Sequence, residues 1–133
     1  MTNETGHKVF PHLINENITY SQFVEVLIKD PEEIRESLTP QKINLLHMVL
    51  GISGEAGELL DSIKKYVIYN KPIDLINIIE ELGDLLFYIE GIKNELHITE
   101  KEILSYNVTK LSKRYKSLSY SDKAAVERKD KNE

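Results

Sequence analysis

Two pairs of acidic residues stand out in this chain of 133 residues. Glu55 and Glu58 lie three residues apart in the segment GISGEAGELLDSIKK. Glu81 and Asp84 repeat that spacing further along the chain. Residues three apart share one face of a helix, so two antiparallel helices would aim four carboxylates at one point. Converging carboxylates need a cation among them, and hard divalent ions prefer oxygen ligands. The spacing therefore predicts a Mg²⁺ site suited to a phosphate substrate.

An acidic pair at this spacing is also common on a helix face that water covers, so each pair has a second interpretation. The pair Glu81 and Asp84 favours a site, because it lies in the apolar segment IIEELGDLLFYIEGI and acidic residues are rarely buried without a partner. Glu80 faces away from this pair and is either a spare ligand or a surface charge. Ser62 and Asn77 lie on the same polar stripes as the two pairs.

His47 lies on the helix face of Glu55, and it is either a hydrogen-bonded helix residue or a substrate contact. A group of cations follows in the segment KLSKRYK, residues 110–116. Together with Lys64 and Lys65, these cations could neutralise the phosphate oxygens that Mg²⁺ leaves uncovered. The alternative for Lys113 and Lys116 is that they complement the dipole at the C-terminal end of a helix.

Helices must position these residues, and helical patterns cover most of the chain. A Thr-Pro start predicts a helix over about residues 40–69, with a possible break at residues 51–54, where glycines weaken it. Gly54, Gly57 and Gly83 are expected to let another helix approach closely. The next helix is expected over about residues 73–95, and a capping box predicts another over 99–115.

The two ends of the chain are harder to interpret. Thr19 and Gln22 form a capping box that opens a helix ending before Pro31. The segment PEEIRES that follows is a solvated linker or a helical turn. Residues 1–18 are expected to form an arm without regular structure, and residues 119–133 a frayed helix or charged tail. The expected fold is a single all-α domain, a bundle of four or five helices.

Composition excludes several classes of function. The chain contains no cysteine, which excludes disulfides, thiolate catalysis and cysteine-based zinc sites. No Glu-x-x-His pair falls on the predicted site helices, which argues against a di-iron site. A net charge of −5 argues against general binding to nucleic acid. The polar start and the lack of a long apolar run predict a cytoplasmic protein without a membrane partner.

The segments GISGEAGELLDSIKK, EELGDLLFYI and NVTKLSKRY resemble the all-α nucleoside triphosphate pyrophosphohydrolases of the MazG-like group. Their pattern is E-x-x-E, a spacer, E-x-x-D and then N-x-x-K-x-x-x-R. The matching residues are Glu55, Glu58, Glu81, Asp84, Asn107, Lys110 and Arg114. The resemblance covers about residues 45–115. The chain departs from it after KRY, where Lys116-Ser117-Leu118 replaces the usual Gly-Phe.

This resemblance implies hydrolysis of a nucleoside or deoxynucleoside triphosphate between the α and β phosphates. The four carboxylates would hold Mg²⁺, with Mn²⁺ as a substitute, and activate water. Substrate would be bound by His47, Lys65, Tyr88, Asn107, Lys110 and Arg114. The resemblance also implies a homodimer or a homotetramer built as a dimer of dimers. Two alternatives are a catalytically silent module that binds Mg²⁺ and nucleotide, and a helical interaction protein of the same fold.

Overall fold

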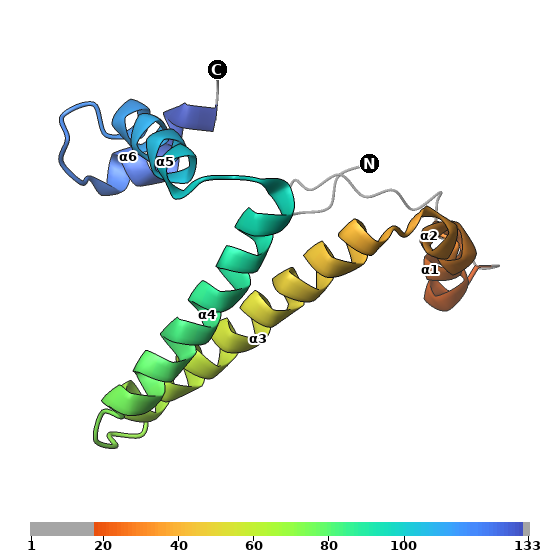
Figure 1. Cartoon of the computed structure of the whole chain (residues 1–133), viewed down its shortest axis with the longest axis horizontal. Coiled ribbons are helices and arrows are strands. Elements are labelled where there is room, and N and C mark those ends of the chain that lie inside the picture. Colours follow the sequence, from red (N-terminus) through yellow and green to blue (C-terminus); the bar gives the residue numbers. More distant parts are fainter. Residues whose placement is uncertain (1–17, 132–133) are drawn as a thin grey trace, which may run out of the picture. The chain divides into compact units, whose positions relative to one another are not determined.

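The computed structural model describes residues 18–131, so most of the predicted N-terminal arm lies outside the described part. All regular elements between these limits are helices: six α-helices and one 3₁₀-helix (Figure 1). The prediction of an all-α fold is confirmed. The contacts within the chain divide it into two compact units, and the boundary in the sequence lies between Thr39 and Pro40. Among the described helices, none combines the length and the apolar character that crossing a membrane requires.

The first unit contains two short helices, α1 (Tyr20–Leu27) and α2 (Pro31–Ser37). Thr19 caps α1 in the predicted reciprocal capping box with Gln22. The side chain of Asp30 caps α2 by accepting a hydrogen bond from the Glu32 amide at 2.9 Å. The segment PEEIRES is therefore a helix, and Pro31 fits at its first position, where no hydrogen-bond donor is needed.

The second unit contains a hairpin of two long helices, α3 (Pro40–Val67) and α4 (Leu75–Leu96) (Figure 1). The two helices run side by side in opposite directions, as the functional prediction requires. The side chain of Asp74 caps α4 by accepting a hydrogen bond from the backbone N–H of Asn77 at 3.1 Å. The possible break at residues 51–54 is absent, because α3 continues through both glycines. The long packing contact with α4 offsets the intrinsic cost of glycine in a helix.

The glycines that allow close approach are not the expected ones. A Cβ atom at Gly54, Gly57 or Gly83 would meet no atom within 4 Å. At Gly51, by contrast, a Cβ atom would overlap the ring of Tyr88, and at Gly91 it would overlap the side chain of Met48. The expectation for the first three glycines is therefore wrong within this chain, since they lie on outward parts of the helices.

The C-terminal part of the second unit consists of α5 (Glu100–Arg114), α6 (Asp122–Glu127) and the 3₁₀-helix η1 (Lys129–Lys131). Thr99 caps α5 in the predicted capping box with Glu102. η1 packs against α5, and the side chain of Asp130 is only 1% exposed. The expected frayed tail therefore contains ordered helices and one buried charge.

The apolar core of the described part is small. Met48, at the contact with Gly91, is its only buried hydrophobic residue. Many large apolar side chains of the hairpin remain exposed, including Leu60 on α3 at 68% and Leu86 on α4 at 66%. Few buried side chains therefore support the hairpin from within the chain, although polar contacts cross between its helices.

Candidate metal centre

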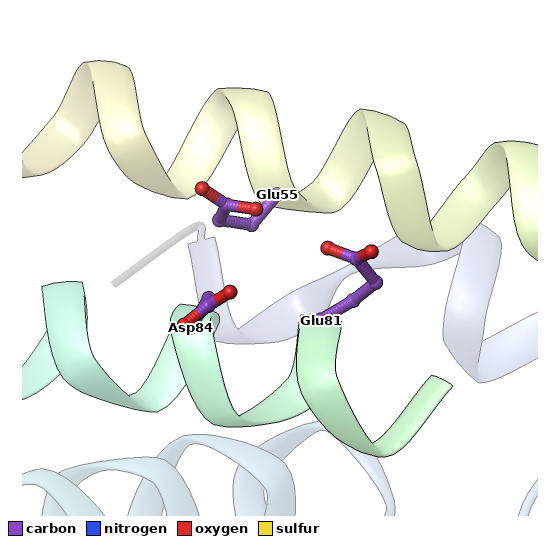
Figure 2. A group of neighbouring side chains, drawn as sticks. All are labelled: Glu55, Glu81 and Asp84. Atoms are coloured by element: carbon purple, nitrogen blue, oxygen red, sulfur yellow. The ribbon is translucent and has the colours of Figure 1, made fainter. Parts of the chain in front are cut away.

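Three carboxylates from the two hairpin helices converge on one point (Figure 2). Glu55 of α3, together with Glu81 and Asp84 of α4, offers oxygen atoms that all lie within 4.8 Å of one another. Glu81 is buried at 7% exposure, whereas Glu55 is half-buried and Asp84 is exposed. The spacing of three residues on α4 directs Glu81 and Asp84 to the side of α3.

The electrostatics of this cluster favour a bound cation. The pKa of Glu55 is raised above its usual value, first by burial and then by the negative charges of Glu58 and Asp84. A side-chain hydrogen bond with Glu81 and the charge of Glu81 raise it further. Part of this rise therefore comes from negative charges that lie close together. Three converging oxygen donors fit a hard divalent cation such as Mg²⁺.

A hydrogen-bonded chain from α3 to α4 holds the buried carboxylate in place. The buried Ser62 hydroxyl donates to Asn77 Oδ1 at 3.2 Å. The side-chain amide of Asn77 in turn donates a hydrogen bond from Nδ2 to Glu81 Oε1. Ser62 and Asn77 therefore fix the orientation of Glu81, as residues hydrogen-bonded to a metal ligand commonly do. The sequence pattern places both residues on the polar stripes but does not predict this supporting role. The signal that could have indicated it is spacing: Ser62 follows Glu58 by four residues, and Asn77 precedes Glu81 by four.

Glu58 lies outside the group of three. It is exposed, although its charge acts on Glu55. Its predicted role as a fourth metal ligand stays a prediction.

His47 and Tyr88 lie close together near the same faces of the hairpin. Their ring centroids are 6.2 Å apart in an edge-on arrangement, and the Tyr88 ring covers Gly51. His47 is exposed and Tyr88 is half-buried. The absent side chain at Gly51 makes room for the tyrosine beside α3. The predicted contact of both rings with substrate stays a prediction.

Lys65 has an acidic neighbour on its own helix. The carboxylate of Asp61 forms ion pairs with Lys64 and Lys65, each at 2.8 Å. Hydrogen bonds from both ammonium groups lower the pKa of Asp61 to about 2. Part of the positive charge expected for substrate binding is therefore already balanced on the surface of α3.

The three predicted phosphate contacts of α5 lie in two different environments. Asn107 and Lys110 are exposed and line one open pocket with Tyr106. Arg114 is instead paired with Asp130, through Nε at 2.7 Å and Nη2 at 2.8 Å. Within residues 18–131, no hydrogen bond or ion pair links these three side chains to the carboxylate cluster. Their role in binding phosphate stays a prediction.

Comparison with known families adds one finding. The family model of the MazG nucleotide pyrophosphohydrolase domain matches residues 44–119, which is more than half of the chain. The matched range contains the three converging carboxylates, the supporting residues Ser62 and Asn77, and the whole of α4 and α5. No curated protein and no solved structure matches the chain.

Proposed function

Because the chain belongs to the MazG nucleotide pyrophosphohydrolase domain family, we propose that it hydrolyses nucleoside or deoxynucleoside triphosphates between the α and β phosphates. Water adds to the α-phosphorus, and the bond from that phosphorus to the bridging oxygen breaks. The products are the nucleoside monophosphate and pyrophosphate. The observation that supports this reaction best is the convergence of Glu55, Glu81 and Asp84 inside the range that matches the family.

We assign the binding of Mg²⁺, or of Mn²⁺ in its place, to these three carboxylates, with Glu58 as a fourth ligand. When bound, the cation neutralises the triphosphate and favours in-line attack by water. The protein fixes the position of Glu81 through Asn77 and Ser62. One carboxylate of the cluster, or the neighbouring Glu80, accepts the proton that water loses.

Substrate binding is assigned to residues of α3, α4 and α5. Lys65, Asn107, Lys110 and Arg114 are proposed to contact phosphate oxygens. His47 and Tyr88, whose rings lie 6.2 Å apart, are proposed to contact the sugar or the base. We expect these reactions to take place in the cytoplasm, without nucleic acid or membrane as a partner.

We also propose that the active form is a homodimer or a dimer of such dimers. The hairpin exposes large apolar side chains on both helices, among them Leu60, Ile76 at 73% and Phe87 at 67%. Burying a side chain of this size contributes about 1.5–3 kcal/mol. A second copy of the hairpin is complementary in length and apolar character, and it would supply the core that one chain lacks.

The experiment is a measurement of pyrophosphate release from a panel of common and modified nucleoside and deoxynucleoside triphosphates, with Mg²⁺ and with EDTA. The variant Glu81→Gln removes one charge from the cluster with little change in shape. Glu90→Gln makes the same change at an exposed position of α4 and serves as the matched control.

We expect Mg²⁺-dependent release that Glu81→Gln lowers at least 100-fold and that Glu90→Gln leaves unchanged, since removing one well-placed electrostatic contact costs about 10²–10³ in turnover. The panel also identifies the preferred base and sugar. If no nucleotide is turned over but Mg²⁺ and nucleotide raise the melting temperature, the chain is the catalytically silent binding module and not an enzyme.

A further inference from the structure

Asp130 is a buried charge that the proposed metal centre does not use. Its side chain is only 1% exposed, and it lies outside the range that matches the family model, which ends at residue 119. A buried carboxylate is costly unless a partner compensates its charge. That partner is Arg114, one of the residues proposed to contact phosphate. A buried acid of the C-terminal segment therefore acts directly on a side chain that the proposed reaction needs.

The contact with Asp130 occupies one edge of the Arg114 guanidinium. Nε donates a hydrogen bond to Asp130 Oδ1 at 2.7 Å, and Nη2 donates one to Oδ2 at 2.8 Å. A guanidinium has five N–H groups, so this contact uses two of them. The other edge, formed by Nη1 and Nη2, is turned away from Asp130. Such an edge can bind two oxygen atoms of a phosphate group at once.

Asp130 lies behind the guanidinium and not on its accessible side. Arg114 is 15% exposed and lines an open cavity at the end of α5, whereas Asp130 is not one of the lining residues. The 3₁₀-helix η1, which carries Asp130, packs against α5. A carboxylate that blocked Arg114 would have to occupy the side that faces the cavity. The arrangement therefore favours support of Arg114 over inhibition.

Such support matters because arginine has a long side chain with many rotamers. A substrate that orders this side chain on binding loses affinity, and a group that orders it beforehand removes that cost. The Arg114 guanidinium in turn holds the pKa of Asp130 at about 2, so the carboxylate remains ionised at neutral pH. The contact is therefore intact under the conditions in which the proposed hydrolysis would take place.

We propose that Asp130 is a positioning residue for this hydrolysis, which holds the free edge of the Arg114 guanidinium toward the phosphate chain of the nucleotide. The inference rests on the proposed function, through the role of Arg114, and Asp130 itself does not touch the substrate. The C-terminal segment thus contributes to the reaction with a residue from outside the matched range.

The first experiment measures kcat and KM of the full-length chain and of Asp130→Asn, which keeps the shape of the side chain, with the preferred nucleotide of the panel. We expect kcat/KM to fall about 10–100-fold, mainly through a higher KM, because the substrate must then order Arg114 itself. Asp122→Asn makes the same change at an exposed position of α6, and its amide oxygen can still accept the hydrogen bond from Tyr120. This control should keep both constants unchanged.

The second experiment separates positioning from a purely structural role by a double-mutant cycle with Arg114→Gln. If Asp130 acts only through the guanidinium, adding Asp130→Asn to Arg114→Gln should change kcat/KM by less than about twofold. If Asp130 only stabilises the fold, the same substitution should lower kcat/KM by an equal factor with and without Arg114, and that result would overturn the proposal. The assays are run at a temperature at which melting curves show every variant to be folded.

Failure of this inference can be distinguished from failure of the proposed function. If the unaltered chain hydrolyses nucleotides, an unchanged KM in Asp130→Asn overturns the positioning role, and a lower KM shows that Asp130 inhibits Arg114 instead. If it hydrolyses none, the proposed function fails, and the same variants are titrated calorimetrically with inorganic triphosphate and Mg²⁺. Weaker binding by Asp130→Asn than by Asp122→Asn then supports positioning. Equal binding, or no binding by the unaltered chain, overturns it.

Discussion

At the scale of single residues, the candidate metal centre depends on one buried acid and the amide that holds it. A carboxylate at 7% exposure is costly unless hydrogen bonds or a cation compensate it. Asn77 supplies one hydrogen bond to Glu81 and receives one from Ser62. One oxygen atom from each of Glu55, Glu81 and Asp84 lies within 4.8 Å of the others, and a cation bound among them would compensate their charges.

The variant Asn77→Ala should lower the apparent affinity for Mg²⁺ by about 10–100-fold, the usual effect of losing a supporting residue. The reason is that Glu81 keeps its charge but loses the contact that fixes its orientation. The measurement is the Mg²⁺ concentration that gives half of the maximal shift in melting temperature. Asn94→Ala, at an exposed position of the same helix, should match the unaltered chain. Equal Mg²⁺ affinity in the two variants would show that Asn77 has no supporting role.

The contribution of Glu58 can be separated from that of the three converging carboxylates. Glu58→Gln should weaken Mg²⁺ binding less than Glu81→Gln does, because Glu58 is exposed and lies outside the group of three. Both variants are titrated with Mg²⁺ in the same melting experiment. A larger effect of Glu58→Gln would mean that the fourth carboxylate joins the site in the bound state and that the three-residue description is incomplete.

At the scale of the elements, α3 and α4 are held in register by small residues opposite large ones. Gly51 faces the ring of Tyr88, and Gly91 faces the side chain of Met48. Gly51 lies four residues from both His47 and Glu55, so its contact with Tyr88 helps to set the height at which the two helices meet. The register then decides which oxygen atoms come within 4.8 Å.

Gly51→Ala should destabilise the chain relative to Gly54→Ala. At Gly51 the added methyl group forces the Tyr88 ring to move, and overpacking of this kind costs about 1–3 kcal/mol. At Gly54 it meets open space within the chain, and alanine favours a helix over glycine by about 0.5–1 kcal/mol. Unfolding in denaturant gives both free energies. If Gly51→Ala is as stable as Gly54→Ala, the close approach of Tyr88 to α3 is wrong.

The attachment of η1 to α5 should depend on pH through Asp130. The Arg114 guanidinium lowers the pKa of Asp130 from 3.8 to about 2. A carboxyl group with a lowered pKa stabilises the folded state above its ordinary value, and this stabilisation is lost as the pH falls toward the folded-state value. Between about pH 4 and pH 2, the unaltered chain should therefore lose more stability than Asp130→Asn.

Denaturant unfolding at several pH values in this window measures the difference. Asp61, whose pKa is also lowered to about 2, adds a similar dependence that is present in both proteins and therefore cancels in the comparison. Parallel pH profiles of the two proteins would contradict the contribution of the Arg114–Asp130 pair.

At the scale of the whole molecule, the described part of the chain buries one hydrophobic residue and exposes many. A fold held mainly by caps, polar contacts and one long helix contact has little free energy to spare. Apolar faces on this scale usually mark an interface. The proposed second copy would supply both the missing core and a physical reason for the apolar outer faces of the hairpin.

Leu60→Lys should therefore weaken self-association, because it places a charge on an apolar face of α3 that is 68% exposed in one chain. We expect the unaltered chain to sediment as a dimer or tetramer and to melt at a temperature that rises with protein concentration. Asn94→Lys, a charge added at an exposed polar position, should change neither property. A monomer at all concentrations, with unchanged melting in Leu60→Lys, would contradict the proposed dimer.

Much of the fold follows from local sequence patterns. The caps at Thr19 and Thr99 lie where the sequence predicts them, because a cap depends on contacts within four residues. The hairpin helices begin and end within about two residues of their expected limits. The faces that carry Glu55, Glu81 and Asp84 also follow from spacing alone, because helical periodicity determines which side chains point the same way.

Only the tertiary structure decided how these faces meet. Periodicity does not determine the height at which α3 lies against α4, so it did not select Gly51 and Gly91 as contacts, or Asn77 as the support of Glu81. It also did not pair Arg114 with Asp130, 16 residues away. Such pairings depend on which distant segment docks where, and the free energy that decides this comes from contacts that no local pattern contains.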